Sequence, residues 1–115
     1  MSDNKNTLLQ INKFGMGEGD EVLGLSLIGN YFKLVLQEDA LPKVIAFYNG
    51  GVKLVCQGSP VIESLKEIES KGVKLIACKT CLNHFGLLDK IEVGTGGTMI
   101  DIIMLQKEAK KVITL

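Results

Sequence analysis

The chain has 115 residues, 46% of them hydrophobic and 23% charged, and its 13 acidic residues balance 13 basic residues. This length and composition predict one globular domain over residues 1–115, large enough to bury a hydrophobic core. The zero net charge argues against nucleic acid or a membrane surface as a partner. All 13 basic residues are lysines, so the bidentate arginine contacts that often recognise phosphate are absent.

The N-terminal region is polar and then briefly apolar, without the basic segment and long apolar core of a secretory signal. The longest apolar-rich stretch, residues 22–29 (VLGLSLIG), includes Gly and Ser and is far shorter than the roughly 20 residues that span a bilayer. We therefore expect a cytoplasmic protein with no membrane span. Cys56, Cys78 and Cys81 are expected to be reduced thiols, because an odd number of cysteines in a reducing compartment disfavours a disulfide framework.

In chain order, the first predicted unit is a strand, a loop and a helix. Residues 8–14 (LLQINKF) alternate like a strand and lead into a glycine-rich loop at residues 15–20. Asp20 is placed to cap the helix that follows, in which residues 22–36 carry a wide apolar face at helical spacing. Beyond it, residues 44–48 (VIAFY) form the nearly continuous apolar run that is typical of a central parallel strand.

The middle of the chain predicts a turn and a second helix. The glycines of residues 49–51 (NGG) force a turn, after which residues 52–56 are expected to extend briefly. Ser59 in the N-cap position and Pro60 in the first helical position predict the start of a helix, and Gly72 supplies a left-handed stop.

The last part of the chain continues the alternation of strands and helices. Residues 73–77 (VKLIA) predict a strand, and a short helix is expected from about residue 80 to residue 85. Residues 94–97 are expected to be loop, and Thr98 with Asp101 has the spacing of a capping box for another helix. Residues 112–115 form a last strand. This order predicts an α/β fold with a mainly parallel sheet covered by helices on both faces.

Cys78 stands at the carboxyl end of its predicted strand and directly before a helix, where reactive groups collect in open α/β sheets. The helix N–H groups and the neighbouring Lys79 are expected to lower the pKa of its thiol. A thiolate there can take the outer sulfur of a persulfide and pass it to another thiol. Cys81 lies one helical turn further on and is expected to assist, by resolving the persulfide or closing a disulfide.

The two thiols and the nearby histidine are also compatible with a metal site, a redox disulfide or simple packing. Cys78, Cys81 and His84 have the spacing C-x2-C-x2-H, and Cys56 is a possible distant fourth zinc ligand, but this is not the usual pair-plus-pair set, so no metal is expected. A thioredoxin-type oxidoreductase also carries C-x-x-C after a strand, although no Trp or Pro flanks the motif here. Either thiol can instead pack inward as a small hydrophobe. His84 is either an acid-base group or a solvated helix residue.

The glycine-rich loop, residues 15–20 (GMGEGD), is a weak candidate for a phosphate cradle. Its spacing is G-x-G-x-G, and its acidic side chains would repel a phosphate. A tight turn between strand and helix is the preferred interpretation, and no organic cofactor is expected.

Several segments in a fixed order resemble the DsrE/DsrF-like family, and within it the selenium-associated YedF-like group: residues 17–24 (GEGDEVLG), 41–43 (LPK), 47–54 (FYNGGVKL), 58–61 (GSPV), 78–82 (CKTCL) and 86–87 (GL). The resemblance covers nearly the whole chain. It implies a five-stranded, parallel-type α/β sandwich that assembles into oligomers, and a cysteine that holds sulfur as a persulfide. That cysteine corresponds to Cys78, and the C-x-x-C form of the YedF-like group matches Cys78 with Cys81.

The sequence therefore predicts a cytoplasmic sulfur-relay carrier, for sulfur or selenium, or a sulfurtransferase-like protein, with a persulfide on Cys78. Its expected partners are sulfur donor and acceptor proteins, among them the TusA-like domain that is fused to this one in full-length YedF-like proteins, and further copies of the chain. The alternative is a non-catalytic oligomeric binding module in which the thiols are structural.

Overall fold

A single sheet of five parallel strands, in the order β4-β3-β2-β1-β5, organises the computed structural model, which describes residues 5–115. The strands are β1 (Thr7–Ile11), β2 (Val44–Phe47), β3 (Lys74–Cys78), β4 (Thr95–Gly97) and β5 (Lys111–Thr114). The helices are α1 (Glu21–Gln37), α2 (Ile62–Ser70), α3 (Lys79–His84) and α4 (Met99–Glu108), with a 3-10 helix η1 (Asn49–Val55). The predicted α/β fold with five parallel strands is confirmed.

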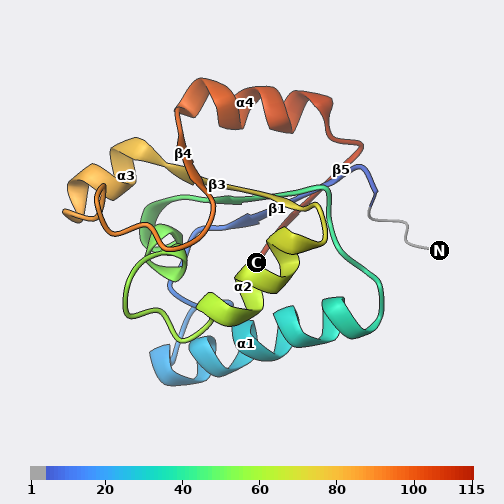
Figure 1. Cartoon of the computed structure of the whole chain (residues 1–115), viewed down its shortest axis with the longest axis horizontal. Coiled ribbons are helices and arrows are strands. Elements are labelled where there is room, and N and C mark those ends of the chain that lie inside the picture. Colours follow the sequence, from blue (N-terminus) through green and yellow to red (C-terminus); the bar gives the residue numbers. More distant parts are fainter. Residues whose placement is uncertain (1–4) are drawn as a thin grey trace.

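Helices cover both faces of the sheet (Figure 1). One face carries α1 and α2, which bury Ile28, Phe32, Leu65 and Ile68 against it. On the other face, α4 connects β4 at one edge with β5 at the other. The central strand β2 is buried along its whole length, which accounts for its continuous apolar sequence. Among residues 5–115, no helix combines the length and the apolar character that crossing a membrane requires.

A polar connection fastens α4 to the sheet. The side-chain amide of Gln10 in β1, almost fully buried, donates to the hydroxyl of Thr114 at 2.9 Å, and its carbonyl accepts from Gln106 of α4 at 2.6 Å. A buried amide without partners would cost about 1–3 kcal/mol, so these bonds help to fix α4 and β5 relative to β1.

Several predicted helix boundaries are confirmed. The Leu23 N–H donates to Asp20 Oδ2 at 2.7 Å, so Asp20 caps α1. Thr98 and Asp101 form the complete capping box at the start of α4. Gly72, after α2, has a φ of 95°, the left-handed conformation expected of a helix stop.

Three local predictions are wrong. Residues 52–55 do not extend, because the chain winds into η1 directly after β2; of the predicted segment only Cys56 is extended, in an isolated antiparallel bridge with Ile91. α2 begins at Ile62 and not at Pro60, since Ser59 Oγ accepts the N–H of Val61 in a separate turn. The predicted loop at residues 94–97 holds β4, which is paired with β3 over Ile76–Cys78.

Candidate functional site

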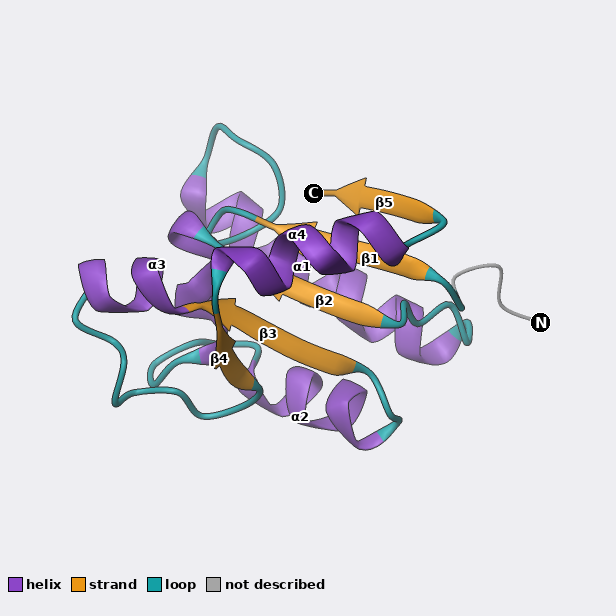
Figure 2. Ribbon diagram, turned by 90° about the horizontal axis from the view of Figure 1, so that it is seen from above, coloured by secondary structure: helices purple, strands orange, loops and turns teal. Residues whose placement is uncertain are grey.

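The carboxyl ends of the strands lie at the same edge of the sheet as α3 (Figure 2). Cys78 is the last residue of β3, and α3 begins at the next residue, Lys79. Cys78 keeps an extended backbone, and Cys81 follows within the first turn of α3. The predicted position of the C-x-x-C motif, at the end of a strand and the start of a helix, is therefore confirmed.

The two thiols of the motif differ in their exposure to solvent. Cys78 is only 1% exposed and belongs to the hydrophobic core, whereas Cys81 is partly exposed. Cys81 follows Cys78 by three residues in the first turn of α3, so the two sulfur atoms can approach each other. Both cysteines, and Cys56, are free thiols. Sulfur chemistry between Cys78 and Cys81 thus needs no large rearrangement, but a molecule in solution meets Cys81 first.

The Cys81 sulfur has a second partner in η1. The backbone N–H of Asn49 donates to Cys81 Sγ at 3.0 Å. An N–H aimed at sulfur stabilises a thiolate more than a thiol, because a hydrogen bond to a charged acceptor is the stronger one. The turn that follows β2 therefore supplies a backbone donor to the exposed thiol.

The position of this donor depends on the fit of η1 against β1. Asn49 has a φ of 50°, in the left-handed region that asparagine tolerates better than most residues. At Gly51, an added Cβ would overlap the carbonyl oxygen of Ile11, so only glycine allows this approach. The Tyr48 N–H also donates to the Ile11 carbonyl at 3.1 Å. These contacts hold Asn49 beside α3.

The surroundings of Cys81 raise the pKa of its thiol. Burial is the largest cause, and the hydrogen bond and charge repulsion from Cys78 act in the same direction, while the Asn49 N–H partly offsets them. Cys81 is therefore mainly protonated at neutral pH, and its reactivity is expected to rise with pH.

An open hollow of about 340 Å³ surrounds Cys81 and is lined by Asn49, Thr80, His84 and Phe85. A neighbouring hollow shares Asn49, so the accessible surface continues along the carboxyl ends of the strands.

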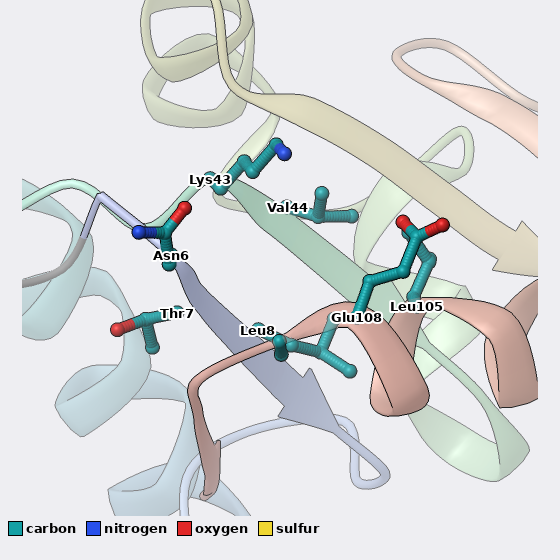
Figure 3. A pocket seen from close by; sticks show the side chains of 8 residues that line it. Asn6, Thr7, Leu8, Lys43, Val44, Leu105 and Glu108 are labelled. Carbon is teal, nitrogen blue, oxygen red and sulfur yellow. The ribbon is translucent and has the colours of Figure 1, made fainter.

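The pocket in Figure 3 lies at the opposite, amino end of the strands, between Asn6, Lys43 and Glu108. Its cavity of about 30 Å³ has room for only one or two water molecules, which excludes it as a substrate site.

The sequence profile of the DsrE/DsrF-like family matches residues 6–115. The chain belongs to the DsrE/DsrF-like family.

Solved structures share the fold of this DsrE/DsrF-like protein at low sequence identity. The ychN protein from E. coli is 20% identical with a TM-score of 0.69, over 96% of this chain and 99% of that one. MTH1491 from Methanobacterium thermoautotrophicum, a protein of unknown function, is 22% identical with a TM-score of 0.68, over 96% and 99%. BT1422 from Bacteroides thetaiotaomicron, also of unknown function, is 18% identical with a TM-score of 0.68, over 96% and 95%. No curated protein matches the chain.

The four possible zinc ligands are not gathered at one point in this DsrE/DsrF-like protein. His84 is exposed and packs edge-to-face against Phe85, with 5.1 Å between ring centroids. Cys56 is buried, and its thiol donates to the carbonyl of Val52 at 3.3 Å. Within residues 5–115, no group of three or more His, Cys, Asp or Glu side chains is arranged to hold a metal ion.

The sequence did not single out Asn49 as a partner of a thiol. It indicated only that residues 49–51 form a turn. The contribution of Asn49 comes from its backbone N–H, which every residue except proline has, so no side-chain motif marks it. The one available signal is the position of Asn-Gly-Gly directly after a buried strand.

Proposed function

We propose that this DsrE/DsrF-like protein is a sulfur carrier that holds sulfur as a persulfide on Cys78, assisted by Cys81. The observation that best supports this function is the placement of a buried and an accessible thiol one helical turn apart at the carboxyl end of β3. Thiol exchange depends on access to the sulfur atoms. A persulfide at the buried position would be shielded from water and from thiols in solution, while the accessible thiol stays within reach.

The proposed chemistry needs only the two thiols. A cysteine thiolate of the pair attacks the outer sulfur of a donor persulfide, the sulfur–sulfur bond of the donor breaks, the donor leaves as a thiolate, and the sulfur is then held on Cys78. The reverse steps deliver the sulfur to an acceptor thiol. Atoms and charge balance without a metal ion or an organic cofactor, so a sulfurtransferase-like carrier is the appropriate class.

The proposed partners are cytoplasmic sulfur donor and acceptor proteins, with a TusA-like carrier domain as the preferred candidate because of the resemblance to the YedF-like group. Selenium is the alternative cargo for the same thiols.

We also propose that the protein forms homo-oligomers through the outer face of α4. Four large apolar side chains gather there, exposed to between 45% and 71%: Met99, Ile100, Ile103 and Met104.

The second candidate function is a non-catalytic oligomeric binding module with structural thiols. It is favoured by the burial of Cys56 and Cys78 in the hydrophobic core and by the exposed apolar face of α4. The two functions differ in whether any thiol takes up labile sulfur.

Intact-mass measurement after exposure to glutathione persulfide tests the proposal. We expect the wild type to retain the mass of one added sulfur atom after the donor is removed with dilute thiol. Cys56→Ser should behave like the wild type, whereas Cys78→Ser should retain none. Absence of added sulfur from every variant would favour the binding module, and retention by Cys78→Ser would contradict the role of Cys78.

A further inference from the structure

We infer that Cys81 is the thiol through which sulfur enters and leaves the protein, and that Cys78 receives it from Cys81 in an internal transfer. This inference rests on the proposed carrier function and adds an order to its two thiols. It is the reverse of the order that sequence position alone suggests, in which Cys78 meets the donor directly.

Access decides which thiol meets the donor. Cys78 is 1% exposed, whereas Cys81 lines an open hollow of about 340 Å³. A nucleophile that attacks a persulfide must approach along the sulfur–sulfur bond, which requires an open path to its sulfur. Because Cys78 is buried, a donor in solution gains such a path to its sulfur only after local opening of the structure.

The Asn49 N–H supplies the hydrogen-bond donor that the Cys81 sulfur needs when it passes its extra sulfur atom to Cys78. It lies 3.0 Å from Cys81 Sγ, on the exposed side of the Cys78–Cys81 pair. When sulfur moves from Cys81 to Cys78, Cys81 departs as a thiolate, and this N–H stabilises the developing charge in the way that backbone donors stabilise anions at active sites. Asn49 is therefore a positioning residue that acts through its backbone.

The two steps balance in atoms and charge. In the first, the Cys81 thiolate attacks the outer sulfur of the donor persulfide, the donor sulfur–sulfur bond breaks, and the donor leaves as a thiolate. In the second, the Cys78 thiolate attacks the outer sulfur of the Cys81 persulfide, and Cys81 is released as a thiolate. No oxidant or reductant is consumed, because one sulfane sulfur passes between thiols throughout.

The hollow also indicates the class of donor. It is open, and its lining combines a hydroxyl, an imidazole and an aromatic ring from Thr80, His84 and Phe85, with no carboxylate and no lysine among the described residues that line it. Because it is open, it would leave a small ligand largely unburied, whereas a side chain presented by a larger partner can rest in it. We therefore assign it to a cysteine persulfide presented on an extended peptide, for which glutathione persulfide is the simplest probe.

Mass spectrometry of tryptic peptides can follow the order in which the two thiols receive sulfur, because lysines separate all three cysteines. Lys79 lies between Cys78 and Cys81, and Cys56 falls in a third peptide. The wild type is mixed with glutathione persulfide, quenched with an alkylating agent at increasing times, and analysed by mass spectrometry. The extra sulfur is expected first on the peptide of Cys81 and later on that of Cys78. Appearance on Cys78 without an earlier Cys81 persulfide would overturn the inference.

Loading rates of variants give the second test. Cys81→Ser should load Cys78 at least about tenfold more slowly than the wild type, because the donor then waits for local opening. Cys78→Ser should take up sulfur on Cys81 at the wild-type rate but lose it to dilute thiol. Cys56→Ser is the matched control, and circular dichroism checks the fold of each variant.

Equal rates for Cys81→Ser and the wild type would refute passage through Cys81 while leaving the carrier function intact. No uptake by any variant would refute the carrier function itself.

Discussion

Two cysteines three residues apart occupy different environments, and this difference governs what each can do. Cys78 is the last residue of β3 and is buried in the hydrophobic core. Cys81 lies on α3, is partly exposed to solvent and accepts a hydrogen bond from the Asn49 N–H. The pattern C-x-x-C places both sulfur atoms within one helical turn but does not say which is reachable. Under the proposed carrier function, this difference in exposure favours storage at Cys78 and exchange at Cys81.

Alkylation of the native protein provides a measurement of this difference. With limiting iodoacetamide, Cys81 should react at least about tenfold faster than Cys78 or Cys56, because buried thiols react only through local opening. Both slow cysteines are 1% exposed, so they serve as internal references for each other. Peptide mass spectrometry gives the three rates. Equal rates in the native state, or faster modification of Cys78, would contradict the assignment.

The pH dependence of Cys81 reports on its contact with Cys78. Because the pKa of Cys81 is raised, its alkylation rate should climb with pH through a midpoint above that of an ordinary cysteine. In Cys78→Ala, the hydrogen bond and the charge of Cys78 are both lost, so the midpoint should move to lower pH. His84 lines the same hollow, and His84→Gln controls for a change in that lining. An unchanged or higher midpoint in Cys78→Ala would show that the two thiols are not coupled.

At the scale of secondary-structure elements, the sequence predicted what local patterns encode and missed what tertiary contacts impose. Asp20 and the Thr98–Asp101 box cap their helices as predicted, because capping depends on neighbouring residues. β4, with the sequence Thr-Gly-Gly, has no strand pattern and exists because it pairs with β3. The same contrast holds for the candidate site. The position of the two thiols was predictable from the local sequence, but the position of the Asn49 N–H depends on how η1 packs on β1.

Gly51 provides the test of that packing. Gly51→Ala should lower the free energy of unfolding by about 1–3 kcal/mol, because its Cβ would overlap the Ile11 carbonyl. Gly29→Ala is a matched control within α1, where the added Cβ lies 3.8 Å from Val61 and only helix propensity changes. It should raise stability by roughly 0.5–1 kcal/mol. Urea denaturation followed by circular dichroism measures both. A neutral Gly51→Ala would mean that η1 does not depend on this close approach.

At the scale of the whole molecule, the two faces of the sheet and the net charge of the chain influence how copies of the protein associate with one another. The α4 layer crosses the sheet from the β4 edge to the β5 edge (Figure 1). It carries large apolar side chains that are exposed to solvent. Met99 and Ile103, and likewise Ile100 and Met104, are four residues apart, so they form one continuous stripe along the helix. A net charge of zero offers no long-range repulsion between copies, which favours a second copy of this chain as the occupant of that stripe.

Substitution within the α4 stripe should therefore weaken self-association. Ile103, 51% exposed, is on the outer side of α4, and Ile103→Glu would place an unpaired carboxylate in the contact between copies. The dissociation constant should rise at least about tenfold, since burying an unpaired charge in an interface is strongly unfavourable. Leu27→Glu is the matched control, because Leu27 is 43% exposed but lies on α1, across the sheet. Sedimentation velocity at several concentrations measures both variants. If Leu27→Glu dissociates the protein and Ile103→Glu does not, the contact between copies lies on the α1 face.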